Sequence, residues 1–344
     1  MSEFRTFDAD HIDLNGKSLL ITGGTGSFGH CFVETILRRF KPSRLIVFSR
    51  DELKQFEMAA KFPSSKYPCI RYFIGDVRDL LRLELAMRGV DYVIHAAAIK
   101  HVSIAEYNPT ECINTNVIGG QNVFLAAMKA GVKAVIALST DKAANPINLY
   151  GASKLASDKI FIAANSLSGP GGTRYSVVRY GNVMGSRGSV MPLFRKLIDE
   201  NVESLPITDP RMTRFWITIT QGVNFVLACL NRMQGGEIFI PKIPSMNIVD
   251  LAKAMAPDLP HHTVGIRPGE KLHEVMVTQD DARMVWEYDD YYIIKPAFQF
   301  WSDEEFNMNS GVPVEETFMY TSDGNSEWLD SFALQKILEL NVST

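Results

Sequence analysis

Tyr150 and Lys154 have the types and spacing of an acid–base pair. Residues four positions apart lie on the same face of a helix. A phenol ordinarily has a pKa of about 10, too high for a base at neutral pH, and a cation beside it lowers that pKa. The pair comes one loop after Ser139 and Thr140, which end an apolar run. The spacing therefore predicts a tyrosine base that Lys154 assists.

A glycine-rich turn at residues 23–29 follows an apolar run at residues 18–22 and opens a helical pattern. Its glycines would allow a sharp turn, a close approach of backbone N–H groups to a pyrophosphate, and tight helix packing, and the helix N-terminus favours negative charge. The alternative is a tight turn with no ligand. The turn residues predicted to contact a dinucleotide are Gly23, Thr25, Gly26, Ser27, Phe28 and Gly29.

The end of the second apolar run indicates which dinucleotide would bind. NAD-binding proteins usually have an acidic residue there for the ribose 2′-hydroxyl. This chain has Arg50 instead, and a guanidinium can bind a 2′-phosphate. The pattern favours NADP over NAD, although Asp51 argues the other way and a solvated helix face is the alternative. The cofactor contacts predicted here and after the next two runs are Ser49, Arg50, Asp51, Lys54, Asp76, Val77 and Ala96.

Alternating strand and helix patterns would position these residues. Apolar runs with strand character occur at residues 18–22, 44–48, 70–74, 92–95, 134–138 and 175–180, and helical patterns at 51–61, 109–129 and 150–165 lie among them. This alternation predicts an α/β fold with a Rossmann-type doubly wound parallel sheet. We expect a dinucleotide-binding domain at residues 1–182, with interleaving beyond, and a smaller mixed substrate lobe and C-terminal tail at 183–344.

Composition narrows the classes of protein. The chain has 344 residues, 46% apolar and 22% charged, with a net charge of −4, which excludes a disordered chain and a fibre. No basic excess exists to bind nucleic acid. Four scattered cysteines and no clustered histidines predict no metal site and a reducing cytoplasm. The longest apolar stretch, residues 217–230, contains Gln221 and Asn224, so we expect a core helix and no membrane segment.

Together these motifs resemble the extended short-chain dehydrogenase/reductase family. More particularly, they resemble the inverting UDP-N-acetylglucosamine 4,6-dehydratases, which open pseudaminic acid biosynthesis. Membrane-anchored relatives that retain the C5 configuration carry N-terminal hydrophobic spans, and many have methionine at the position of Tyr150, so this chain looks like the inverting branch. The matching motifs are residues 49–54, 95–101, 139–154, 179–183, 208–214 and 265–271, and the resemblance covers about residues 16–338.

The resemblance implies a role for the neighbours Asp141 and Lys142. Such an enzyme oxidises C4 of the sugar, removes the C5 proton while the 6-hydroxyl leaves as water, and returns the hydride to C6. Tyr150 would receive the 4-hydroxyl proton with help from Thr140. Protonated Asp141 would act as the acid and neutral Lys142 as the base, which requires a raised and a lowered pKa respectively. Burial favours both shifts and mutual attraction opposes them; a solvated surface pair is the alternative.

The resemblance also implies residues that hold the substrate, UDP-N-acetylglucosamine. Arg214 and Arg267 would bind the diphosphate, Glu270 the ribose hydroxyls, and Asn182 the sugar or cofactor. Lys100 would reach the substrate or the nicotinamide. By analogy with the family we expect a homo-oligomer.

Two other functions remain open at this stage. A UDP-sugar 4-epimerase on the same scaffold would return the hydride to C4 and would not need Asp141 and Lys142. A non-catalytic NADP-sensing protein would be expected to lack part of the Tyr150–Lys154 pair, and both residues are present.

Overall fold

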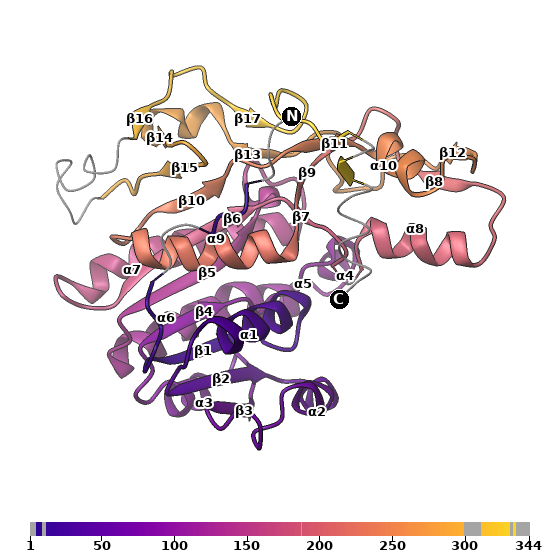
Figure 1. The fold of residues 1–344 in the computed structure, drawn as a ribbon. Helices are drawn as coiled ribbons and strands as arrows, with labels where there is room; N and C mark the ends of the chain where they lie inside the picture. The colour runs from indigo at the N-terminus through magenta and orange to yellow at the C-terminus, as the bar shows by residue number, and fades with distance from the viewer. Residues whose placement is uncertain (1–4, 9–11, 187, 299–310, 331–332, 335–344) are drawn as a thin grey trace.

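A single large sheet organises the molecule (Figure 1). The computed structural model describes residues 5–8, 12–186, 188–298, 311–330 and 333–334. The ten strands lie in the order β16-β14-β15-β10-β6-β5-β4-β1-β2-β3. All pairs from β3 across to β10 are parallel, and the pairs from β10 out to β16 are antiparallel. The order of the first six strands, 3-2-1-4-5-6, is that of a Rossmann fold, so the predicted fold class is confirmed.

The first six strands coincide with the six predicted apolar runs. Every residue of β1 and β4 is buried, which is typical of parallel strands covered on both faces. The runs contain many β-branched residues, which suit a pleated, buried surface. The strands are β1 (Ser18–Thr22), β2 (Arg44–Ser49), β3 (Ile70–Ile74), β4 (Tyr92–His95), β5 (Ala134–Thr140) and β6 (Arg174–Tyr180).

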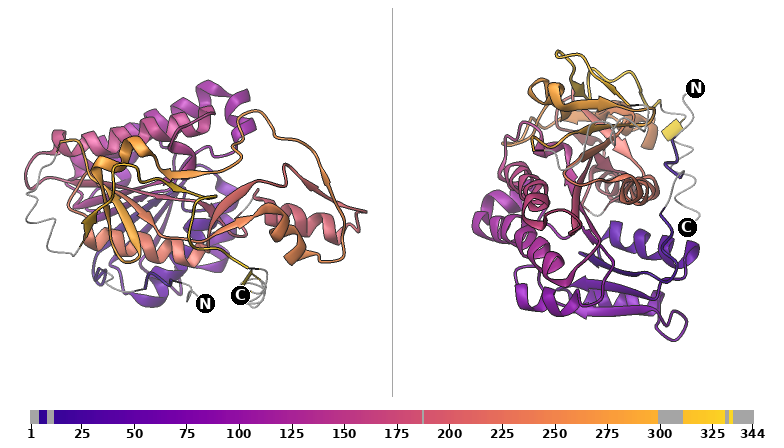
Figure 2. Two further views of the ribbon diagram at one scale, coloured as in Figure 1. Left: turned by 90° about the horizontal axis from the view of Figure 1, so that it is seen from above. Right: turned by 90° about the vertical axis from the view of Figure 1, so that its left-hand side faces the viewer.

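Helices cover both faces of this sheet (Figure 2). On one face α1 (Ser27–Arg39) packs against α9 (Ile219–Arg232), and on the other α6 (Gly119–Ala130) lies between α3 (Leu80–Ala86) and α7 (Leu149–Ser168). Further helices are α2 (Glu52–Lys61) and α4 (Val102–Tyr107). The short α3 and α4 were not predicted, because six or seven residues give too little periodicity to read.

The long helical stretch predicted at residues 109–129 is interrupted. It consists of α5 (Pro109–Ile113), a π-helical turn at Asn114–Ile118, and α6. Within the turn the amide of Asn116 accepts from the Ile99 N–H at 2.8 Å and donates to Ser153 Oγ at 2.9 Å. The π turn therefore ties the loop after β4 to α7, the helix that carries Tyr150 and Lys154.

The predicted core helix at 217–230 is α9, two residues later at each end. The two polar residues within the apolar stretch bind the N-terminal segment, since Gln221 donates to the Arg5 carbonyl at 2.7 Å and Asn224 to the Thr6 carbonyl at 2.9 Å. Gln221 also completes a capping box with Thr218. Gln221 thus caps the start of the helix, and Gln221 and Asn224 together attach the N-terminal segment to it.

Residues beyond 182 form two parts of the fold, an extension of the large sheet and a smaller lobe. β10 (Ile238–Pro241), β14 (Val285–Glu287), β15 (Tyr291–Ile294) and β16 (Val312–Pro313) extend the large sheet. A smaller lobe has its own apolar cluster around Phe194, Trp216 and Leu251. The predicted tail lies partly outside the described residues. The elements of the smaller lobe are β7 (Asn182–Val183), α8 (Val190–Asp199), β8 (Leu205–Ile207), β9 (Thr213–Ile217), β11 (Ser245–Asn247), α10 (Ile248–Met255), β12 (His261–Thr263), β13 (Val275–Val277) and β17 (Tyr320–Thr321).

Replacing Phe161 with alanine should destabilise the fold by about 3–5 kcal/mol, because the ring is fully buried and packs on His95 and Tyr175. Leu167→Ala on the same helix is the matched control; its side chain is 66% exposed, and the loss should stay within about 0.5 kcal/mol. Urea unfolding of the two variants measures the difference. Equal losses would contradict the packing described here.

Candidate active site

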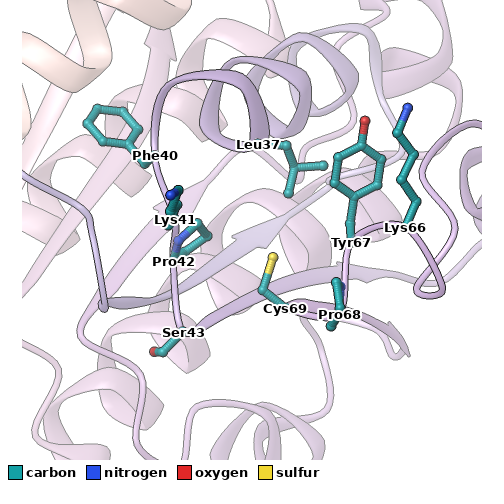
Figure 3. A pocket seen from close by; sticks show the side chains of 9 residues that line it. All are labelled: Leu37, Phe40, Lys41, Pro42, Ser43, Lys66, Tyr67, Pro68 and Cys69. Atoms are coloured by element: carbon teal, nitrogen blue, oxygen red, sulfur yellow. The ribbon is translucent and has the colours of Figure 1, made fainter.

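The predicted site residues gather at the carboxyl ends of the parallel strands, where such sheets bind ligands. A surface hollow lies at the opposite edge, between the end of α1 and the residues that precede β2 and β3 (Figure 3). Its lining comes from residues 37, 40–43 and 66–69 and includes none of the predicted site residues. The chemistry must therefore be sought at the other edge, among the turn after β1 and the loops after β4, β5 and β6.

The glycine turn has the geometry of a cradle. A Cβ on Gly23 would lie 2.8 Å from the Ala97 nitrogen, and one on Gly29 would lie 2.1 Å from the Gly24 carbonyl oxygen, so the backbone itself occupies that space. At Gly26 the nearest atom to such a Cβ is 3.3 Å away. Gly26 also begins α1, whose first turn has no acidic residue and no side-chain cap among the described residues. The fold thus needs Gly23 and Gly29, whereas a Cβ on Gly26 would meet only the Gly23 carbonyl oxygen within 4 Å, and the space beside Gly26 suits a pyrophosphate.

The residues predicted to select the cofactor lie beside this turn. Thr25 Oγ1 donates to Ser49 Oγ at 3.0 Å, joining the turn to the end of β2. The carboxylate of Asp51 caps α2 and pairs with Lys54 at 2.7 Å, so this charge is already balanced. The Arg50 side chain is 59% exposed, and its guanidinium lies 3.7 Å from Asp76. Arg50 is therefore an exposed cation at this edge.

The remaining predicted cofactor contacts lie along the same crevice. The N–H of Ala96 donates to the Thr22 hydroxyl at 3.2 Å, and the Ala96 carbonyl lies directly against the position of a Cβ on Gly23. Val77 is buried, and its carbonyl accepts from the Asn122 amide at 3.1 Å. Asp76 also binds Arg78. Lys100 follows β4 and is exposed.

The structure brings Thr140, Asp141 and Lys142 together just after β5. Thr140 begins a short 3₁₀ helix, Asp141–Ala143, and its hydroxyl donates to Asp141 Oδ1 at 2.8 Å. Lys142 Nζ donates to the same oxygen at 3.1 Å. Asp141 is fully buried, and its Oδ2 has no hydrogen-bond partner among the described residues. The pair is therefore not a solvated surface ion pair.

A second carboxylate, Glu274, completes the cluster. Its Oε1 lies 3.0 Å from Lys142 Nζ and 3.7 Å from Arg214 Nε. The sequence motifs did not mark Glu274, because it lies 132 positions after Lys142 and only the fold brings them together. One signal was available: Glu274 follows closely on the motif at residues 265–271.

The charges of the cluster determine its protonation. Burial raises the pKa of Asp141 despite the attraction of Lys142, which agrees with the predicted acid. Burial acts to lower the pKa of Lys142, but attraction to Asp141 and Glu274 outweighs it, and the pKa lies above its ordinary value. Of the two opposing effects that the sequence left open, attraction therefore outweighs burial at Lys142 in the free protein. For Glu274 burial is opposed by Lys142 and Arg214, which together hold the pKa below its ordinary value.

Tyr150 and Lys154 both lie in the first turns of α7. The helix begins against the loop of the cluster, since a Cβ on Gly151 would lie 2.2 Å from the Lys142 carbonyl oxygen. Burial raises the pKa of Tyr150 to about 12, against the effects of Lys142 and a hydrogen bond with Thr140. The expected lowering by a nearby cation is thus outweighed by burial in the free protein, and the cation that contributes most is Lys142.

Lys154 is buried near Asp158, a carboxylate on the same helix. Burial lowers the pKa of Lys154, while Asp158 acts to raise it. Asp158 in turn accepts from Ser139 Oγ at 2.8 Å and from Arg179 at 3.4 Å. Asp158 therefore holds the end of β5 through Ser139 and attracts the Lys154 ammonium; neither Asp158 nor Arg179 was predicted as a site residue.

The predicted substrate residues divide into two groups. Arg267 is exposed, and its backbone N–H donates to Glu270 at 3.3 Å, in a loop held to the cluster by Lys271 Nζ, which donates to the Ala144 carbonyl at 2.6 Å. Asn182, in β7, is partly exposed. These positions suit a ligand that approaches from solvent.

Arg214 does not fit its predicted role. The side chain is buried, and its guanidinium donates to the carbonyls of Thr213, Leu272 and Lys271 at 2.7–3.0 Å. These bonds and the contact with Glu274 use the donors that a diphosphate would need. In this structure Arg214 supports the 271–274 segment instead.

The described residues contain no group of three or more His, Cys, Asp or Glu side chains that could hold a metal ion. No helix among them is long and apolar enough to cross a membrane.

The strand order, the glycine turn and the Tyr150–Lys154 helix place the protein in the extended short-chain dehydrogenase/reductase class. More narrowly, the chain belongs to the polysaccharide biosynthesis protein family, whose model matches residues 19–296.

Known proteins agree with this placement. The chain is 58% identical, over 94% of its length and 98% of the relative's, to an inverting UDP-N-acetylglucosamine 4,6-dehydratase of Campylobacter jejuni. It is 44% identical to a UDP-glucose 4-epimerase of Rickettsia massiliae, over 81% of this chain and 82% of the relative.

Two solved structures have the same fold. The Pen protein of Bacillus thuringiensis superposes with a TM-score of 0.87 at 35% identity, covering 96% of this chain and 99% of that one. The dTDP-glucose 4,6-dehydratase DesIV of Streptomyces venezuelae, solved with NAD, gives 0.67 at 26% identity, covering 74% and 86%.

The glycine turn yields a matched pair of variants. Gly26→Ala should fold normally and weaken binding of a nicotinamide dinucleotide by about tenfold or more, roughly 1.4 kcal/mol, because the methyl group enters the space left for the ligand. Gly29→Ala should lose thermal stability, because its methyl group cannot fit against Gly24. Thermal unfolding and calorimetric titration separate the two effects. Normal binding by Gly26→Ala would argue against a pyrophosphate at this position.

Proposed function

We propose that the protein is a UDP-N-acetylglucosamine 4,6-dehydratase that inverts C5, a hydro-lyase with internal redox chemistry. The observation that carries this is the buried acid–base cluster after β5, in which Asp141 keeps one carboxyl oxygen without a partner among the described residues. The 58% identity to the Campylobacter enzyme over nearly the whole chain supports it.

The proposed cofactor is NADP. When bound, its nicotinamide accepts a hydride from the sugar and returns it within one turnover. The residues fit such a group: the turn leaves space at Gly26, and Arg50 is an exposed cation at the end of β2. Because Asp51 pairs with Lys54, the negative charge of its carboxylate is balanced and repels a 2′-phosphate less. NAD in the Streptomyces structure keeps NAD as the alternative.

The chain's own residues would move the protons. Tyr150 acts as a phenolate, which the Thr140 hydroxyl and the Lys142 charge stabilise, and becomes a phenol when it receives the 4-hydroxyl proton. The new 4-keto group acidifies C5, and the amine of Lys142 takes the C5 proton. The carboxyl proton of Asp141 goes to the C6 oxygen as the C6–O bond breaks and water leaves. Inversion requires the final proton to reach C5 from the opposite face.

Substrate positioning follows from the same geometry. Arg267 would bind the diphosphate and Glu270 the ribose hydroxyls from the loop that Lys271 attaches to the cluster. Asn182 and Lys100 would contact the sugar side of the crevice.

Three wider proposals rest on the family resemblance. The product would enter synthesis of pseudaminic acid or a related sugar, the enzyme would act in the cytoplasm, and it would form a homo-oligomer. The four cysteines are free thiols, which suits a reducing compartment.

The 4-epimerase is the second candidate, because the Rickettsia relative has that name at 44% identity. An epimerase returns the hydride to C4 and needs no acid and base at C5 and C6. The buried pair Asp141 and Lys142 therefore favours dehydration.

Lys142→Met should abolish dehydration while the fold remains, with kcat lower by about 10²–10⁴-fold as expected for loss of a general base. Incubation with UDP-N-acetylglucosamine in D₂O and proton NMR give the measurement: the wild type yields a C6 methyl signal and deuterium at C5. Lys129→Met, which removes an exposed lysine paired with Glu84 on the surface, is the control. A galacto-configured product from the wild type would indicate the epimerase, and a wild-type rate for Lys142→Met would refute the assigned base.

Arg50→Ala should raise the Kd for NADP by about tenfold and leave that for NAD unchanged, because the guanidinium would contact only the 2′-phosphate. Lys54→Ala should have a smaller effect, since Asp51 already pairs with this ammonium. Titration of each variant with both dinucleotides is the measurement. Equal losses for the two cofactors would show that Arg50 does not read the 2′-phosphate.

A further inference from the structure

Glu274 is a buried carboxylate that the mechanism above does not use. Its side chain is only 2% exposed, and it lies between two cations, with Oε1 3.0 Å from Lys142 Nζ and 3.7 Å from Arg214 Nε. Its Oε2 is buried and has no hydrogen-bond partner among the described residues. Leaving a carboxylate oxygen buried and unsatisfied costs free energy, so such an atom in a native protein calls for a functional explanation.

The surrounding structure fixes Glu274 in place from two sides. Its N–H donates to Ser322 Oγ at 2.9 Å, and the Ser322 N–H donates to the Glu274 carbonyl at 2.8 Å. Ser322 Oγ also contacts Thr213 Oγ1 at 2.7 Å. Arg214 holds the carbonyls of Lys271 and Leu272 just before it. The carboxylate is thus pre-organised against Lys142 by segments of the smaller lobe.

The charges explain why a second carboxylate matters. In the free protein Lys142 is an ammonium, and an ammonium cannot take a proton from C5. The groups that face Glu274 are Lys142, Asp141, Arg214 and Lys271. Of these, Lys142 is the only cation within hydrogen-bond distance that donates to it. A sugar that covers the cluster removes water from it, and loss of solvation favours a neutral amine and carboxylic acid over the ion pair.

We propose that Glu274 is a positioning residue that accepts the ammonium proton of Lys142 and so makes Lys142 the amine that deprotonates C5. The inference rests on the proposed dehydratase function. One N–H bond of Lys142 breaks and an O–H bond forms on Glu274. The C5–H bond then breaks, and its proton forms a new N–H bond on Lys142 while Asp141 protonates the leaving C6 oxygen. After elimination Lys142 gives a proton to Asp141 and takes back the proton of Glu274, and C5 receives the proton that Tyr150 took from the 4-hydroxyl, so the cluster ends each turnover as it began.

Glu274→Gln tests this role, because the amide keeps a hydrogen-bond acceptor for Lys142 but cannot take its proton. We expect kcat to fall about 10²-fold or more with KM little changed. The low-pH limb of the kcat profile, which reports protonation of Glu274, should disappear. C4 oxidation precedes the blocked step, so reduced nicotinamide should accumulate on the variant. Glu274→Asp, which keeps the carboxylate, should recover part of the rate.

Glu287→Gln is the matched control; it removes a carboxylate that pairs with Lys242 at 2.8 Å, outside the site, and should leave kcat and its pH profile unchanged. Thermal unfolding of all variants shows whether the fold survives. Wild-type kcat and an unchanged low-pH limb in Glu274→Gln would overturn the inference and leave the dehydratase intact. Loss of C4 oxidation together with elimination would also overturn it. If the wild type formed no C6 methyl product, the proposed function itself would fail, and the inference with it.

Discussion

The contact of one partly buried ammonium with two buried carboxylates is the interaction on which the site depends. Lys142 lies about 3 Å from both Asp141 and Glu274, and both carboxylates are almost fully buried. An isolated charge at this depth would be expelled or neutralised. The mutual attraction keeps Lys142 and Glu274 ionised, while burial favours the protonated form of Asp141. The cluster therefore combines one ion pair with a carboxyl group whose pKa burial raises.

Segments far apart in the chain must meet to hold this arrangement. The parallel strand β5 delivers Asp141 and Lys142 to the carboxyl edge of the sheet, and Gly151 lets α7 begin directly against the Lys142 carbonyl. Glu274 comes from the other side, carried by the segment before β13. Arg214 fixes that segment through its backbone carbonyls. The smaller lobe thus contributes Glu274 to the cluster, in addition to any contact that it makes with the substrate.

Local sequence patterns predicted those parts of the structure that local physics determines. The six parallel strands and the glycine turn follow from apolar runs and from steric limits that act over a few residues. Glu274 could not be found in this way, because its partner Lys142 is remote in sequence. The predicted role of Arg214 does not fit the structure for a related reason. The sequence does not show that the Arg214 guanidinium donates its hydrogen bonds to backbone carbonyls. The pKa of Lys142 depends on the sum of burial and two attractions, and the sequence gives only their signs.

The cluster also bears on which reaction this scaffold carries. A relative named as an epimerase is 44% identical to this chain, and fold alone does not decide the reaction. Oxidation at C4 needs only the tyrosine and its lysine. Burying a lysine and two carboxylates rarely adds stability compared with apolar residues of similar size. Asp141 and Glu274 each keep a carboxyl oxygen with no hydrogen-bond partner among the described residues. Such groups indicate a reaction that transfers protons at positions other than C4 of the sugar. Elimination across C5 and C6 is such a reaction.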